Sequence, residues 1–170
     1  RYIIALSELG LKNHDLIFLL QNNITYIKKM FYDSSLFESH LELMIYQEYF
    51  SNKEQINNAL LKADSILEIN KNLNIKVTFY TDTNYPQELA KINNPPAIIY
   101  YKGGEFSEIS QYSIACVGTR KPTKLSYNAV NYLVPQWINN NCSIISGLAC
   151  GVDKLSHQAC ISAGGKTVAV

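Results

Sequence analysis

The first part of the chain places its apolar residues at the spacing of an amphipathic α-helix. Leu16, Leu19 and Leu20 stand at positions i, i+3 and i+4. Two later stretches, residues 41–49 and 56–70, repeat this periodicity. The pattern predicts several short helices that bury one face each, and therefore a small all-helical region.

The pattern changes at Ile75. Residues 75–80 alternate like a β-strand, and Pro95-Pro96 precedes a second β-rich run over residues 97–101. Gly103-Gly104 closes this run as a turn. We therefore place a domain boundary near residue 74.

A regular alternation of elements begins at Tyr112. Short apolar strands are predicted at residues 113–117, 143–145 and 166–170, with helices over about 124–139 and 152–163 between them. Strand, helix, strand, helix, strand with short links is typical of a parallel sheet with right-handed crossovers. The pattern predicts a βαβαβ unit.

These elements predict an α/β fold with a Rossmann-like, mostly parallel sheet, preceded by a small all-helical domain of SAM/HhH-like type. The helical domain covers residues 1–74 and the Rossmann-like domain covers residues 75–170. Three parallel strands with bare edges would be poorly covered, so we expect the second domain to be incomplete at its C-terminal end.

Two details of the predicted helices bear on packing. In the helix over residues 124–139, Leu125, Ala129, Leu133 and Trp137 share one face, and Pro135 is expected to kink or divide the helix. Gly164-Gly165 is expected to end the next helix in a left-handed cap.

Composition narrows the choice of partners. The formal net charge is +1, so any contact with nucleic acid must come from a local cluster of cations. The four cysteines form no CxxC pair, and buried free thiols are expected for most of them. No apolar run approaches the length of about 20 residues that a membrane span needs, so we expect a cytoplasmic protein without membrane contact.

Two loops follow neighbouring strands of the predicted sheet: residues 118–123 and residues 146–151. Ligands of open parallel sheets collect at this edge, and both loops lead into helix N-termini. Glycines at 118, 147 and 151 free backbone amides, hydroxyls are available, and Arg120 offers a planar fork that matches two phosphate oxygens. The residue types predict a phosphate site.

Plainer interpretations stand beside this one. A glycine after a parallel strand is often only a turn requirement, and Arg120 could pair with a surface carboxylate. Asp153 and His157 stand at i and i+4 but lack a third ligand for a metal. Asp153 also suits the first turn of a helix in a purely structural role. Neither GxGxxG nor GxxxxGK is present, so dinucleotide and P-loop sites lack their fingerprints.

The same motifs, taken in order, resemble the DNA-processing protein family called DprA or Smf. Residues 114–123 resemble its VGxR strand and loop, and residues 146–153 match its SGxAxGxD signature. His157 occupies the position of the family's helix histidine, and residues 164–170 match the following GGxT strand. Upstream, residues 85–103 resemble its YPxxL and PP motifs, so the resemblance runs from about residue 84 to the end.

The resemblance implies a protein that holds single-stranded DNA by its backbone, hands it to the recombinase RecA and forms a homodimer. It implies no catalytic residue, no cofactor and no metal. Asp153 and His157 would order the pocket. The residues expected to contact DNA lie in the two loops: Gly118, Thr119, Arg120, Lys121, Ser146, Gly147, Ala149 and Gly151.

Two alternatives remain open. A nucleotide-metabolising, phosphoribohydrolase-like enzyme could use the same scaffold, although its PGGxGTxxE loop is missing from this chain. A NAD-dependent enzyme is disfavoured by the missing fingerprint. The chain also departs from the family pattern, with Cys150 where a larger or basic residue is common and Ser126 where glycine is common.

Overall fold

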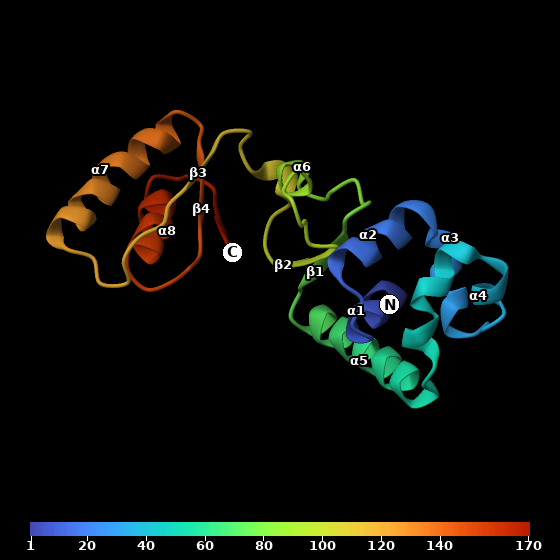
Figure 1. Ribbon diagram of the computed structural model, residues 1–170. Helices are drawn as coiled ribbons and strands as arrows, with labels where there is room; N and C mark the ends of the chain where they lie inside the picture. Colours follow the sequence, from blue (N-terminus) through green and yellow to red (C-terminus); the bar gives the residue numbers. More distant parts are fainter. The chain divides into compact units, whose positions relative to one another are not determined.

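The computed structural model describes residues 1–170 and divides into two compact units, Arg1–Gly104 and Glu105–Val170 (Figure 1). The mixed fold, with a helical first part and a parallel sheet in the last part, confirms the predicted fold class. No helix is both long enough and apolar enough to cross a membrane.

The first unit is mostly helical. Its helices are α1 (Tyr2–Glu8), α2 (Asn13–Asn22), α3 (Ile24–Ile27), η1 (Lys29–Phe31), α4 (Leu36–Ser39), η2 (Leu41–Phe50), α5 (Lys53–Asn72) and α6 (Gln87–Ala90). Asn52 caps the longest of them, α5, because its side-chain oxygen accepts hydrogen bonds from the amides of Glu54 and Gln55.

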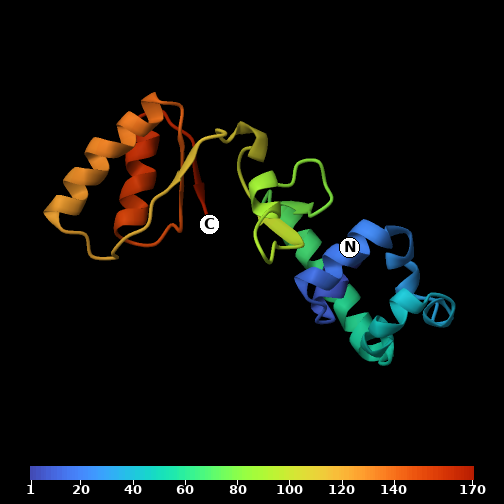
Figure 2. The same ribbon diagram turned by 45° about the horizontal axis from the view of Figure 1, so that its top comes forward.

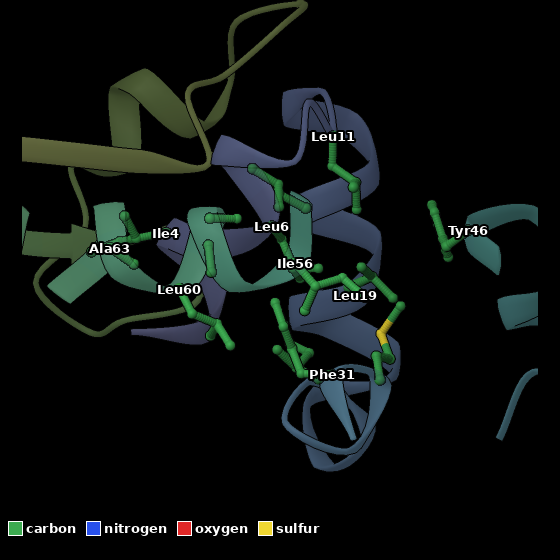
Figure 3. Packing of buried hydrophobic residues seen from close by; sticks show 14 of the residues in the cluster. Ile4, Leu6, Leu11, Leu19, Phe31, Tyr46, Ile56, Leu60 and Ala63 are labelled. Carbon is green, nitrogen blue, oxygen red and sulfur yellow. The ribbon is translucent and has the colours of Figure 1, made fainter. Parts of the chain in front are cut away.

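One hydrophobic cluster holds these helices together. Ile4 and Leu6 of α1, Leu19 of α2 and Ile56 and Leu60 of α5 contribute to it, and Figure 3 shows their side chains interleaved between the helices. The periodicity of α2 and α5 predicted this core, since their predicted apolar faces are the buried ones.

The segment η2 differs from its prediction. It is a 3-10 helix, and its buried residues are Leu43 and Tyr46. The α-helical spacing predicted for residues 41–49 places Leu41, Met44 and Ile45 on one face with Glu48 and Tyr49. The first three are exposed, and of this group only Tyr49 packs against the core. A 3-10 helix has three residues per turn, so positions i and i+3 share a face. The α-helical face was therefore the wrong one.

An antiparallel ribbon completes the first unit. Strands β1 (Lys76–Phe79) and β2 (Ile98–Tyr101) pair with Val77 opposite Tyr100. Ala97 belongs to the helical cluster, and Phe79 and Ile98 pack against it. The compact units therefore divide at Gly104, although the sequence changes character near residue 74.

The second unit is the βαβαβ arrangement that the sequence predicts. It contains η3 (Phe106–Glu108), β3 (Ser113–Ala115), α7 (Lys124–Asn139), β4 (Ser143–Ser146), α8 (Val152–Ser162) and β5 (Thr167–Ala169). The strands are parallel in the order β3-β4-β5, and α7 and α8 lie side by side against one face of the sheet (Figures 1 and 2). Gly164 follows α8 with φ of 74°, the left-handed cap that was predicted.

Helix α7 corrects two predictions. Its buried residue is Val134, with Val130, Trp137 and Ile138 packed into the same small core. Of the predicted face, Trp137 does pack into this core, whereas Leu125 is 78% exposed. Pro135 neither ends nor divides the helix, which is continuous from Lys124 to Asn139.

This correction gives a test of the packing. Val134→Ala removes buried methyl groups from a core with few members, and we expect it to lower the free energy of unfolding by about 2 kcal/mol. Leu125→Ala, its control, should change it by less than about 0.5 kcal/mol. Chemical denaturation of both variants measures the difference. Equal losses would mean that the predicted face is buried after all.

Candidate functional site

The two loops predicted to bind phosphate meet at one edge of the sheet. Strands β3 and β4 are parallel neighbours with Ala115 opposite Ile145, so the loops that follow them leave the same edge. The Cys116 amide continues the pairing with a hydrogen bond of 2.9 Å to the Ile145 carbonyl.

The loops contact each other directly. The Val152 amide donates a hydrogen bond of 3.1 Å to the Thr119 carbonyl. Gly151 lies so close to the first loop that a Cβ atom on it would stand 2.2 Å from the Thr119 oxygen and 2.7 Å from the Cα of Arg120. Its φ of 98° is also a conformation that favours glycine. Gly151 is therefore a point of close contact between the two loops, and we call this contact the lock.

The other two glycines also serve this packing. A Cβ on Gly118 would lie 2.7 Å from the Val152 side chain, and one on Gly147 would lie 3.0 Å from an oxygen of Asp153. From the sequence alone, a glycine in these loops is expected to form a turn or to let the backbone amides approach a ligand. The structure adds a third, because each glycine makes room for a group of the chain itself.

The locked loop leaves a row of backbone amides without partners. The amides of residues 147–151 and of Asp153 donate no hydrogen bond within the chain. The Lys154 amide, by contrast, donates to the Ala149 carbonyl at 3.1 Å and closes the turn. Successive free amides at a helix N-terminus form a concave site that attracts anions.

The hydroxyl groups have other partners. Ser146 is buried, and its Oγ donates to the Cys116 carbonyl at 2.6 Å. Thr119 Oγ1 accepts from the Lys121 amide, and Thr123 Oγ1 accepts from the Ser126 amide as the cap of α7. These side chains therefore stabilise the two loops. The hydrogen-bond donors of the second loop that stay free are its backbone amides.

Asp153 lies against Gly147 of the second loop, and His157 lies one turn further along α8, against the start of β5. Both are buried, and the Thr167 hydroxyl donates to the Ile144 carbonyl at 2.8 Å. Thr167 Oγ1 lies 2.7 Å from His157 Nδ1 and, having committed its proton, accepts from that nitrogen. His157 Nε2 has no partner. These contacts tie α8 to β4 and β5, and no three His, Cys, Asp or Glu side chains gather as metal ligands.

Four cations on the two loops or at the starts of the helices that follow them have no ion-pair partner. Arg120 and Lys121 are exposed in the first loop, Lys124 begins α7, and Lys154 lies in the first turn of α8. A cation at a helix N-terminus opposes the helix dipole, at a cost of about 0.3–1 kcal/mol. Cations placed there without partners indicate an anionic ligand.

Lys154 is the residue that the sequence analysis missed. The sequence does point to Lys154, because it stands three residues after Gly151, in the first turn of the helix. An acidic side chain would interact better with the helix dipole at this position. The only acidic residue of that turn is Asp153, which is buried beneath Gly147.

The two buried cysteines of the second unit, Cys116 and Cys160, are poor nucleophiles. Burial raises the pKa of the Cys116 thiol and, likewise, that of the Cys160 thiol. Both groups are therefore protonated at neutral pH. Cys150 is exposed in the second loop, and all four cysteines are free.

With this geometry in place, comparison with known proteins gives the family. The model of the family "DNA recombination-mediator protein A" matches residues 76–170, so the chain belongs to this family, the DprA/Smf proteins. The family match begins at β1, whereas the second compact unit begins at Glu105.

Individual relatives agree. The DNA processing protein DprA of Bacillus subtilis is 33% identical over 118 residues, which are 69% of this chain and 40% of the relative. That of Streptococcus pneumoniae is 36% identical over 89 residues, which are 52% of this chain and 31% of the relative. The chain thus spans less than half the length of these relatives.

A solved structure supports the fold. The X-ray structure of DprA from Streptococcus pneumoniae superposes with a TM-score of 0.67 at 22% identity, over 99% of this chain and 56% of that one.

The lock between the loops can be tested with two glycines of the second unit. Gly151 and Gly164 both have positive φ, but only Gly151 faces an obstacle, since nothing lies within 4 Å of a Cβ on Gly164. Gly164→Ala should cost about 1 kcal/mol of unfolding free energy from backbone strain alone. Gly151→Ala should cost at least about 2 kcal/mol more, because the Thr119 carbonyl must move. Equal costs in thermal or chemical denaturation would contradict the lock.

Proposed function

We propose that this chain binds single-stranded DNA by its phosphate backbone at the edge formed by the two loops. The observation that carries the proposal is the row of free amides over residues 147–151, bordered by cations that lack partners. One charge-assisted hydrogen bond contributes about 1.5–3 kcal/mol, so a few amides and Arg120 suffice for a phosphate.

The choice of DNA as ligand rests on the relatives. Those matched are named for DNA processing, and the family for mediating recombination. We accordingly propose a role in DNA processing during recombination and natural transformation, with transfer of the strand to RecA and a homodimer as the working form. Residues Gly118 to Lys121, Gly147, Ala149 and Gly151 would contact the backbone, while Ser146, Asp153 and His157 would order the site.

A non-enzymatic role fits this site. Its free groups are hydrogen-bond donors and cations, which bind a phosphate chain without breaking it. The nearest buried thiol, Cys116, has a raised pKa, and the Ser146 hydroxyl already donates to a carbonyl. A cytoplasmic location stays a prediction.

The experiment measures oligonucleotide affinity against salt concentration by fluorescence anisotropy. Arg120→Ala and Lys154→Ala should each weaken binding to every sequence alike, because phosphate contacts carry no base information. Each should also reduce the log–log salt slope by about 0.7, the value for one phosphate contact to a single strand.

The control is Lys166→Ala. Lys166 is an exposed cation of the same unit, but it precedes β5 at the opposite edge of the sheet. Its Nζ lies 3.7 Å from Oε2 of Glu108. Its removal should leave the slope unchanged. If Arg120→Ala and Lys166→Ala reduced the salt slope equally, general attraction to the positive charge of the protein would explain binding, and no specific site would be needed.

A further inference from the structure

The ribbon of β1 and β2 has free backbone groups along β2. The Tyr80 amide donates to the Ala97 carbonyl at 3.0 Å, next to the pairing of Phe79 with Ile98. In an antiparallel ladder this bond flanks a pair whose own amides and carbonyls point away from the partner strand, and every second residue repeats that orientation. The amides of Ile98 and Tyr100 therefore face outward, and neither donates a hydrogen bond outside the ribbon.

The two edges of the ribbon differ. On β1 the outward amide of Phe79 donates to Asp82 Oδ2 at 2.9 Å. On β2 the outward amides have no such acceptor, and the sheet has no third strand. Proteins usually cover or pair an exposed edge, because its free amides and carbonyls are a template for another strand. The edge of β2 is therefore open to a further strand.

An apolar groove lies beside this open edge. Ile98 and Tyr100 line it from β2, and Ile66 and Ile69 line it from α5, around a volume of about 430 Å³. Asn70 lines the same groove, is 8% exposed, and has no hydrogen-bond partner for its Nδ2. Buried donors without a partner are rare in folded proteins. This one indicates that the occupant of the groove supplies an acceptor.

The charge of the groove narrows the choice of occupant. Glu8 is the one charged residue that lines it. Burial and the nearby Glu8 carboxylate raise the pKa of Tyr100. Lys62 Nζ lies 3.5 Å from Glu8 Oε2, but this lysine is exposed and does not line the groove. A negative charge without a cation in the groove repels phosphate and attracts a basic side chain, so a nucleic acid does not suit this place.

We propose that an extended segment of a partner protein adds to β2 as a third strand and fills this groove. Its backbone exchanges hydrogen bonds with Ile98 and Tyr100, and every second side chain points into the groove that these two residues line. The segment is therefore apolar at alternate positions. It also carries a basic residue that meets Glu8 and an acceptor for Asn70 Nδ2. The inference concerns the first unit and does not depend on the phosphate site of the second.

The probe is a phage-displayed library of random peptides of about eight residues, slightly longer than a typical strand. Selection on the folded protein should enrich sequences that alternate between apolar and polar residues and contain a lysine or arginine. The most enriched peptide is then synthesised with a fluorescent label, and its affinity for the protein and for each variant is measured by anisotropy.

Tyr100→Pro tests the open edge. Proline is tolerated where the amide of a strand faces away from the sheet, so this change removes the outward amide and keeps the pairing with β1. We expect Tyr100→Pro to bind the peptide about tenfold more weakly than Tyr100→Ala, which keeps the amide. Val77→Pro is the matched control, because Val77 pairs with Tyr100 and its amide faces the opposite edge. It should leave the affinity unchanged.

Asn70→Leu tests the unpaired donor. It should bind the peptide about fivefold more weakly, because an acceptor of the peptide loses its partner. Without peptide, the same variant should have a raised melting temperature, because an apolar side chain replaces a buried amide that lacks a hydrogen bond.

Methylation of the peptide's own amides tests the pairing without altering the protein. Methyl groups on every second amide should abolish binding when those amides face β2. The alternate set of methylated amides faces away from β2 and should be tolerated. This measurement decides the matter even if a proline variant fails to fold.

Each other result overturns the proposal. No enriched peptide, or a peptide that binds despite both methylation patterns, would exclude a third strand. Self-association that Tyr100→Pro abolishes would assign the edge to a second copy of this chain, and weaker binding of oligothymidylate by Tyr100→Pro would assign it to DNA. Failure of the phosphate site would be distinguishable, since the unaltered protein would still bind the peptide.

Discussion

The contact between Gly151 and the Thr119 carbonyl is the constraint on which this site depends. It holds the loop after β4 against the loop after β3, and the hydrogen bond from the Val152 amide to the same carbonyl fixes the start of α8. With the loop ends held in this way, the amides of residues 147–151 have no partner in the chain. A side chain at position 151 would separate the loops and move the free amides away from the Arg120 backbone.

Several features of the site lower the stability of the folded chain. Unpaired cations stand at helix N-termini, Leu148 has a strained backbone, and the amides around it lack partners. The core that supports these features is small, with Ile144, Val134 and Cys160 at its centre. Local conflicts of this kind are expected at functional sites, where the ligand supplies the missing interactions. A polyanion would relieve the first and third of them.

Much of this architecture was predictable because it follows from order along the chain. Alternating strands and helices require a parallel sheet, and the loops after neighbouring strands must then share an edge. The face of α7 was not predictable in the same way. Leu125 and Leu133 form one apolar stripe, and Val130, Val134 and Ile138 form another, so the spacing alone could not choose between them. The three-residue periodicity of η2 could not be predicted either, because nothing in the sequence of that segment distinguishes a 3-10 helix from an α-helix.

Within the site, residue types were predictable and their partners were not. The roles of Ser146 and of the three glycines depend on groups that are distant in sequence, such as the Cys116 carbonyl and the Val152 side chain. An amide NMR titration of the protein with a short oligothymidylate tests the phosphate site most directly. We expect the amide signals of residues 147–151 and of Asp153 to shift first and furthest. Shifts confined to residues 1–104, with these amides unchanged, would contradict it.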